Sequence, residues 1–391
     1  MSTSTRPLAH GKDAIRAHHL AVVLAAIRSH HPVARTTLTA ELGLSRTSIA
    51  ELTTQLSALG LISETPQRPA GGAGRPSLLL HPSDRVGSYA VNPESDVTTV
   101  GFVGLDGIVR TRRAAPTPSG ASSAEVALLC AELIADIAAE ISGDARAVGI
   151  GAGIPGQVDR TTGRVVDAPR LAWCDVDFAA ELAAATGLPA QADNNARLAT
   201  DVEYRMRAAS GVRHLVYLFG GTGGIGAGVV SDGVLLRGAH GFAGELGHVR
   251  QSSAAARDFS GLAGTIEALV QRDALRQSTG EDWSDALASQ PAAGEMRDEV
   301  RDAVEALGVA IGNTVNSFDP EVVVLGGFLA PLARIDPALL AASIRSSAMP
   351  SLAERVRVEP TEGVTDAVLI GAAELWSREI EANPLAFAAP A

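Results

Sequence analysis

The stretch from Ser45 to Leu59 carries polar side chains at a spacing that could read DNA. Ile49, Leu52, Leu56 and Leu59 recur at helical spacing and form one apolar stripe, so the polar positions face the other way. Ser45 stands where the N-cap of such a helix is expected. The major groove of DNA accepts a helix of this kind, with polar side chains on base edges and phosphates. The predicted DNA contacts on this helix are Ser45, Arg46, Thr47, Ser48, Glu51, Thr54 and Gln55.

Two further helices are predicted to position this reading helix. Apolar residues at helical spacing predict a first helix over 13–29, which Pro32 ends, and a short second helix over 36–42. Gly43 supplies a tight turn before the third helix, a spacing typical of a helix-turn-helix. An ordinary helical bundle without affinity for DNA is the alternative that this pattern leaves open.

A β-hairpin is predicted after the third helix. Residues 61–82 form a short strand, a tip rich in Pro and Gly, and a second apolar strand, which would complete a winged helix-turn-helix. Arg68 and Arg75 would project from the tip, and an arginine suits a narrow minor groove because the negative potential is enhanced there. A disordered linker is the alternative. The return of apolar residues at 78–80 favours the wing.

The charge is distributed unevenly along the 391 residues. The formal net charge is −12, yet residues 1–90 hold nine basic and five acidic residues, which leaves +4 on this part and −16 on the rest. A mildly basic head on an acidic body fits a DNA reader, since only the head must approach phosphates. Two cysteines exclude a disulfide framework and a four-thiolate zinc site. Without an apolar run of membrane-spanning length or a secretory signal, a cytoplasmic protein that contacts no membrane is expected.

From Ser88 onward, short apolar strands alternate with helices, which predicts an α/β fold. A hairpin is expected over 97–110 with its turn at Asp106-Gly107, and a strand over 147–154 enters a Gly-rich loop. Two α/β lobes with a cleft between them would explain this order. The other predicted strands are 214–219, 225–236 and 322–325, and the predicted helices are 125–141, 194–208, 301–318 and 367–378.

Five strings then occur in a recognisable order: GIGAGIPGQVDRTTGRVVDAPRLAW, GLPAQADNNARLATDVEYR, GGTGGIGAGVV, GFAGELGH and DPEVVVLGG. Together with the N-terminal winged helix, they resemble the repressor branch of the ROK family of sugar kinases and repressors, over essentially the whole chain. The resemblance implies an actin-like ATPase fold of two lobes, a hexose pocket in the cleft, and a homodimer or homotetramer. The expected organisation is a disordered arm over 1–12, a winged helix-turn-helix over 13–84, and a two-lobed effector and dimerisation domain over 85–391.

The chain departs from the kinase pattern of this family at the first phosphate turn. In the kinases this turn reads Asp-x-Gly-Gly-Thr, and its glycines let the backbone approach the nucleotide phosphates. Asn92, Glu94, Ser95 and Asp96 stand at those four positions here. Two carboxylates in place of a glycine and a threonine would repel a polyphosphate, so no nucleotide cofactor is expected.

A second departure removes the general base. The family's catalytic aspartate follows Gly-Leu-Pro within Glu-Asn-Asp-x-Asn, and counting from Gly187 puts Asn195 at its position. An amide can hydrogen-bond a hydroxyl but cannot accept its proton at neutral pH. A shift of two residues would give the role to Asp193. The residues that follow, Leu198, Ala199 and Glu203, support the first register, and the chain is therefore predicted not to be an enzyme.

The third departure concerns metal, because Asp258, Ser260 and Thr265 stand where the family's zinc site has three cysteines. No metal is expected, and packing is expected to hold the turn. The resemblance assigns contacts with sugar hydroxyls to Glu245, His248 and Glu267, and the predicted effector site comprises Gly153, Arg170, Asn194, Asn195, Glu245, His248 and Glu267.

Several roles stay open at this site. Arg170 replaces an asparagine of the family and could pair with a phosphorylated or acidic sugar. Glu245 and His248 could merely brace a loop, and the Gly-rich segment 220–228 could cradle phosphate, although a structural role is favoured for it.

The combined pattern predicts a DNA-binding transcriptional regulator, most simply a repressor of sugar uptake or catabolism genes. Its partners would be operator DNA and a sugar or sugar phosphate effector. An ATP-dependent sugar kinase with an appended head, and a regulator with no sugar ligand, are the two alternatives.

Overall fold

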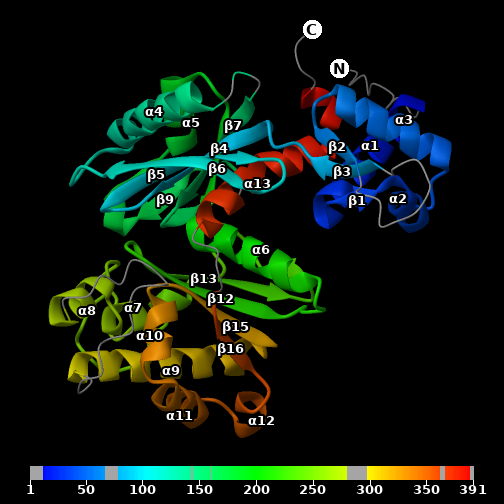
Figure 1. Ribbon diagram of the computed structural model, residues 1–391. Helices are drawn as coiled ribbons and strands as arrows, with labels where there is room; N and C mark the ends of the chain where they lie inside the picture. Colours follow the sequence, from blue (N-terminus) through cyan, green and yellow to red (C-terminus); the bar gives the residue numbers. More distant parts are fainter. Residues whose placement is uncertain are drawn as a thin grey trace, which may run out of the picture.

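The computed structural model describes residues 12–66, 78–141, 143, 145–159, 161–279, 297–361 and 366–387. The N-terminal part is a small head of helices and strands (Figure 1). Its helices α1 (Lys12–His30), α2 (Arg35–Leu42) and α3 (Arg46–Ala58) pack around buried aliphatic side chains, among them Leu20, Leu38 and Ile49. Gly43 ends α2 with a left-handed φ of +66°, a conformation that glycine adopts without strain.

A three-stranded antiparallel sheet completes the head. Strands β1 (Val33–Ala34), β2 (Ile62–Pro66) and β3 (Leu78–Pro82) lie in the order β1-β3-β2. The pairing of Ile62 with Pro82 and of Pro66 with Leu78 makes β2 and β3 the two sides of a hairpin, as expected for a wing. Arg68 and Arg75 belong to 67–77, outside the described residues.

The body consists of two α/β lobes, the fold expected from the sequence (Figure 1). In the first lobe the strand order is β11-β7-β4-β5-β6, and a small sheet β10-β9-β8 lies beside it. Helices α4 (Ser123–Glu140) and α5 (Phe178–Thr186) pack on this lobe. The strands are β4 (Val86–Pro93), β5 (Val97–Gly104), β6 (Val109–Pro116), β7 (Arg146–Ile154), β8 (Gln157–Val158), β9 (Val165–Ala168), β10 (Trp173–Val176) and β11 (Ala190–Asn194).

The second lobe repeats the five-stranded plan in the order β14-β13-β12-β15-β16. Its interior strand β15 (Val322–Gly327), which lies between β12 and β16, is buried on both faces, as its run of valines requires. The other strands are β12 (Leu215–Gly221), β13 (Gly224–Ser231), β14 (Val234–Leu235) and β16 (Arg357–Pro360). Its helices are α7 (Ile266–Leu269), α8 (Arg272–Thr279), α9 (Asp298–Phe318), α10 (Leu329–Ile335), α11 (Pro337–Ser347) and α12 (Pro350–Ala353).

One predicted strand was wrong. The sequence indicated a single strand over 225–236, but the structure has two strands, β13 and β14, that pair antiparallel. Asp232 and Gly233 between them both have positive φ, +51° and +78°, which reverses the chain in a tight hairpin. Ser231, Asp232 and Gly233 interrupt the apolar pattern, and the Asp-Gly pair is a turn signal that the prediction of a single strand overlooked.

Two helices connect the lobes. Helix α13 (Ala367–Ala382) packs on β4 and β7 of the first lobe, while α6 (Asn195–Ala208) packs on β12 and β13 of the second. The two helices also pack against each other, and Figure 1 shows them between the two sheets. No helix in the described part of the chain is both long and apolar enough to cross a membrane.

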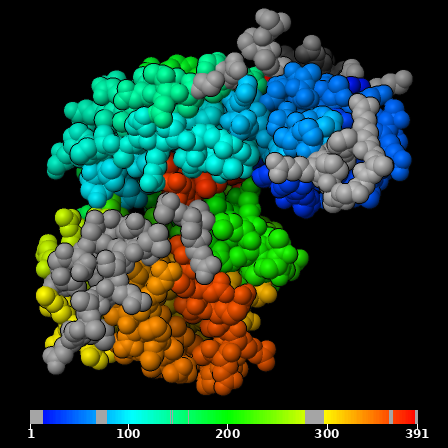
Figure 2. Space-filling view, viewed as in Figure 1, coloured from blue at the N-terminus to red at the C-terminus, as the bar shows by residue number. Residues whose placement is uncertain are grey.

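The head is fixed to the first lobe by a buried interface (Figure 2). The apolar core of the head continues into Leu105 and Ile380 of the body. Arg28 of α1 lies 2.5 Å from Glu374, pairs with Glu381, and donates to the Leu105 carbonyl at 2.8 Å. The side chains of Arg28 and Glu374 are only 7% and 8% exposed, so removal of either would take a charged partner from a buried group and leave Arg28 with Glu381 alone, or Glu374 with Arg205 alone.

Candidate functional site

Helix α3 presents the polar face that the sequence predicts. Thr47, Glu51 and Thr54 are exposed, as is Arg46, while Ile49 and Leu56 on the opposite side are fully buried. Ser45 caps the helix by accepting a hydrogen bond of 3.0 Å from the Ser48 backbone N–H. The serine cap fixes where the helix starts and therefore which residues face outward.

Three of the predicted DNA contacts, Ser45, Ser48 and Gln55, already have side-chain partners within the head. The Gln55 amide accepts a hydrogen bond of 2.8 Å from Arg16 of α1, and the Ser48 hydroxyl lies 2.9 Å from that of Ser45. Sequence reasoning missed Thr53, a buried hydroxyl on the apolar side of α3 that accepts from Arg35 at 2.9 Å. Arg35 also pairs with Glu64 of β2, so this set ties α2 and α3 to the wing. The sequence signal for Thr53 was its position, which helical spacing places on the buried and otherwise apolar face of α3.

A cavity of about 350 Å³ lies between the two lobes. Its volume falls in the range of small-molecule sites. The first lobe supplies Pro155, Gly156, Asp167 and other residues, while the second supplies the Gly-rich turn at Gly221–Ile225. Five of the seven predicted effector residues line it: Asn194, Asn195, Glu245, His248 and Glu267. The sequence reasoning missed Gln157 and Asp167, two polar residues that also line the cavity.

The two asparagines begin helix α6 at the wall of the cavity. Asn194 is the N-cap: its oxygen accepts from Arg197 N–H at 2.9 Å, and its amide donates to the Gly156 carbonyl at 2.9 Å. Asn195 accepts from the Ala196 N–H at 2.7 Å, which directs its amide group toward Glu94, 3.4 Å away. Both amides therefore have fixed orientations, and Asn195 retains donor capacity toward the cavity.

Asp193 faces a different set of residues. Its carboxylate pairs with Arg197 and lies 3.2 Å from Arg237, and its side chain is 9% exposed. It is not among the residues that line the cavity. Of the two residues that the sequence offered for the position of the family's base, Asn195 lines the cavity and Asp193 does not.

His248 lies among three carboxylates. Its Nδ1 is 2.9 Å from Asp258, and its Nε2 is 3.8 Å from Glu245 at the cavity. Burial opposes the charged imidazolium, but the hydrogen bond to Asp258 and the charges of Glu267 and Glu245 outweigh it and raise the pKa of His248. Burial also raises the pKa of Glu245 and of Glu267. The histidine thus braces the turn through one nitrogen and faces the cavity with the other.

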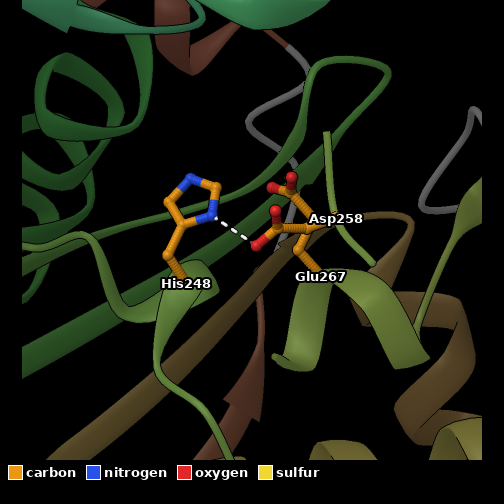
Figure 3. A group of neighbouring side chains, drawn as sticks. All are labelled: His248, Asp258 and Glu267. Atoms are coloured by element: carbon orange, nitrogen blue, oxygen red, sulfur yellow. Dashed lines mark hydrogen bonds and ion pairs between the residues drawn. The ribbon is translucent and has the colours of Figure 1, made fainter. Parts of the chain in front are cut away.

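The turn that carries zinc in the family is closed here by a carboxylate. Asp258 Oδ2 accepts from His248 Nδ1 at 2.9 Å (Figure 3). The same oxygen accepts from the Thr265 hydroxyl at 2.9 Å, and Oδ1 accepts from Leu262 N–H at 2.8 Å. Donor atoms of His248, Asp258 and Glu267 lie within 4.8 Å of one another. The fully buried Asp258 carboxylate is nevertheless already engaged, and no thiolate is available, so these residues do not fit the family's structural zinc. Hydrogen bonds, and not packing alone as the sequence suggested, hold this turn.

The other two predicted effector residues lie outside the cavity lining. Gly153 is buried in β7, where a Cβ atom would come within 2.6 Å of Val368, so its role is in packing. Arg170 donates to the Thr222 carbonyl at 3.0 Å, pairs with Asp273 at 3.3 Å and stacks 4.0 Å above the Phe259 ring. Its guanidinium therefore binds the second lobe.

Comparison with known proteins agrees with this architecture. Residues 95–379 match the model of the ROK family. A putative xylose repressor from Caldicellulosiruptor sp. (strain Rt8B.4) is 29% identical over 330 residues, which cover 78% of this chain and 82% of that protein. A glucokinase from Thermotoga maritima is 30% identical over 269 residues, covering 63% of this chain and 84% of that enzyme.

Among solved structures, a ROK family transcriptional regulator described as a homologue of E. coli MLC superposes with a TM-score of 0.73 at 23% identity, over 96% of this chain and 99% of that one. A ROK glucokinase from Streptomyces griseus in complex with glucose and AMPPNP covers 74% of this chain and 98% of its own, with a TM-score of 0.60 at 22% identity. The kinase therefore shares the fold of most of this chain, whereas the regulator shares the fold of nearly all of it. The family model spans well over half of the sequence, and the chain belongs to the ROK family.

Proposed function

We propose that this protein is a DNA-binding transcriptional repressor of sugar uptake or catabolism genes, with a body that senses a sugar or sugar phosphate and no longer transfers phosphoryl groups. The observation that carries the proposal is the exposed polar face of α3 on a winged head that is joined to a sugar-kinase body. The similarity to a putative xylose repressor supports the same reading. The proposed units are a reading head over 13–84 and an effector and dimerisation body over 85–391.

The absence of kinase activity is part of the proposal. Asn195 lines the cavity where the family's general base would stand, and an amide cannot take a hydroxyl proton at neutral pH. Glu94 and Asp96 occupy positions of the first phosphate turn. Asn195 can still bind a sugar hydroxyl, so the cavity keeps a ligand role without a catalytic one.

A route for the signal runs through α6. This helix starts at the cavity with Asn194 and Asn195, and near its other end Arg205 lies 2.7 Å from Glu374. The other oxygen of Glu374 binds Arg28 of the head. A sugar that draws the lobes together therefore acts on the helix that touches the head's anchor, and in a homodimer this would change the spacing of the two heads on a pseudo-palindromic operator.

A gel-shift titration of the full chain against DNA flanking its own gene tests the proposal. Sequence-preferring binding at moderate salt is expected, and its absence ends the proposal. Thr47→Ala should weaken specific binding by about 1–3 kcal/mol, whereas Arg46→Ala should weaken binding to all sequences and lower the salt slope by about 1. Ser57→Ala, exposed near the other end of the same helix, is the matched control and should bind as the wild type does.

The competing function is a hexose kinase with a regulatory head, which the similarity to a glucokinase favours. A coupled ADP assay over a hexose panel separates the two, and turnover that Asn195→Ala abolishes would establish the kinase. A thermal-shift screen with the same sugars identifies the effector, since a ligand that binds only the folded state raises the melting temperature. No stabilisation by any sugar would point instead to a regulator without a sugar ligand.

A further inference from the structure

Glu94 reaches from the first lobe to the Gly-rich turn of the second. It follows strand β4, and its Oε2 accepts hydrogen bonds from the Thr222 hydroxyl and from Gly223 N–H, the latter at 3.0 Å. Thr222 and Gly223 form the turn between β12 and β13. A Cβ atom on Gly221 would come within 3.1 Å of Glu94 Oε1, so the glycine leaves room for the carboxylate. The turn thus binds an anion that the chain itself supplies.

Burial makes these contacts obligatory for the carboxylate. Glu94 is only 6% exposed, and a carboxylate taken from water into such a place needs hydrogen-bond donors around it. Burial raises the pKa of Glu94, and the hydrogen bonds from Thr222 and Gly223 partly oppose that rise. A backbone N–H and a hydroxyl that converge on one oxygen are the donors that glycine-rich turns offer to phosphate groups.

The Asn195 amide completes the set of donors. Its Nδ2 lies 3.4 Å from Glu94 Oε1, whereas an aspartate at the same position would put a second carboxylate beside the first. Two like charges at this separation in a buried site repel strongly. The departures at positions 94 and 195, which lie far apart in the sequence, are therefore chemically matched.

Two further contacts join the lobes beside Glu94. Asp96 lies 2.9 Å from Arg272 at the start of α8, and Arg170 of the first lobe donates to the Thr222 carbonyl at 3.0 Å. Thr222 is thus held through its hydroxyl by Glu94 and through its carbonyl by Arg170. None of these contacts requires a nucleotide.

We propose that Glu94 is a built-in anion that binds the Thr222–Gly223 turn in place of a nucleotide phosphate and thereby holds the two lobes together. On this proposal, the Glu94 carboxylate occupies the turn that a phosphate of a bound nucleotide would otherwise occupy. The inference concerns the cleft alone, so it stands or fails independently of operator binding.

Double-mutant cycles on the full chain, followed by urea unfolding, test this inference. Glu94→Gln and Thr222→Val should each lower the unfolding midpoint, and their effects should fall short of additive because both remove the same interaction. Asn195→Asp should lower the midpoint in the wild type and do so less in the Glu94→Gln background. Thr361→Val is the matched control, since Thr361 is a buried threonine that donates to another glutamate, Glu203, and its effect should add to that of Glu94→Gln.

The outcomes separate cleanly. Coupling in both Glu94 cycles, with additivity in the Thr361 control, supports the internal anion. Additive effects in both Glu94 cycles overturn it, because the carboxylate would then not depend on the turn or on Asn195. If Glu94→Gln does not fold, Glu94→Asp replaces it, because the shorter side chain keeps the charge but withdraws it from the turn. Thr222→Val should then lower the unfolding midpoint less in the Glu94→Asp background than in the wild type. An equal decrease in the two backgrounds also overturns the inference.

Discussion

The two turns that face each other across the cleft differ in composition. The turn at 92–96 holds no glycine, whereas the turn at 220–224 holds four. Packing explains the second turn: a Cβ atom on Gly220 would meet Phe328 at 2.6 Å, and one on Gly224 would meet Glu267 at 2.1 Å. Glycine stands where the fold itself needs a close approach. The turn at 92–96 instead carries polar side chains, and Glu94 and Asp96 bind residues of the other lobe.

The largest expected loss of stability comes from a side chain added to the turn at 220–224. Gly224→Ala places a Cβ atom against Glu267 at a backbone φ of +121°, which side chains rarely adopt. Overpacking of this kind costs about 1–3 kcal/mol, and the strained φ adds about 1 kcal/mol. Urea unfolding measures the loss. Ser95→Gly places a glycine in the turn at 92–96, and its unfolding free energy should stay within about 0.5 kcal/mol of the wild type. Equal losses of stability in Gly224→Ala and Ser95→Gly would show that the two turns are equally constrained.

The turn at Asp258 extends the comparison to a turn that a buried carboxylate holds together. Asp258→Asn removes the charge that His248 and Thr265 bind and should cost about 1–2 kcal/mol. It should also lower the pKa of His248, which NMR titration of the imidazole follows. Asp175→Asn, an exposed ion-pair partner of Arg164 elsewhere in the body, is the control and should leave that pKa unchanged.

The raised pKa of His248 gives this prediction a pH dependence. The charged imidazolium stabilises the fold, so its contribution is present in full below the ordinary value of 6.5 and is lost as pH rises through the higher folded value. Stability of the wild type should therefore fall across this window more steeply than that of Asp258→Asn. Parallel pH profiles for the two proteins would show that the Asp258 contact is not what raises the pKa.

Arg170 binds the Gly-rich turn at 220–224 through the Thr222 carbonyl, so a substitution at Arg170 measures how much this contact contributes to stability. Arg170→Met removes the hydrogen bond to the Thr222 carbonyl and should cost about 1 kcal/mol with or without a ligand. The sequence left open a second role, in which Arg170 pairs with a phosphorylated or acidic sugar. Calorimetric titration distinguishes these two roles of Arg170. If Arg170→Met keeps the affinity for glucose but loses affinity for glucose 6-phosphate, the result would support pairing with a phosphorylated sugar.

The smallest effect is expected at Asp96. Its ion pair with Arg272 spans the lobes, but the Asp96 side chain is 46% exposed and therefore well solvated. Asp96→Asn should change stability by less than about 1 kcal/mol, and the change should shrink with added salt. A loss as large as that of Gly224→Ala would mean that the first turn is as tightly constrained as the second.

Local patterns predicted the three helices and the hairpin strands of the head, and the longer helices of the two lobes such as α4, α9 and α13, but several shorter elements, among them α5, β11 and β16, were not predicted. The apolar stripe from Ile49 to Leu56 and the cap at Ser45 fixed the orientation of α3, because helical spacing determines which side is buried. The family motifs identified five residues that line the cavity. They could not show that Arg170 points to Thr222, since that depends on where the second lobe lies. The roles of Glu94 and Asp258 were hidden for the same reason, as their partners come from other segments.

The buried pairing of Arg28 with Glu374 and Glu381 has a consequence for protein engineering. A chimaera that grafts this head onto a body without carboxylates at these two positions would bury the arginine without its partners. Such hybrids should express poorly unless both glutamates of α13 are transplanted as well. The exchangeable module is therefore the head together with the face of the C-terminal helix on which it rests.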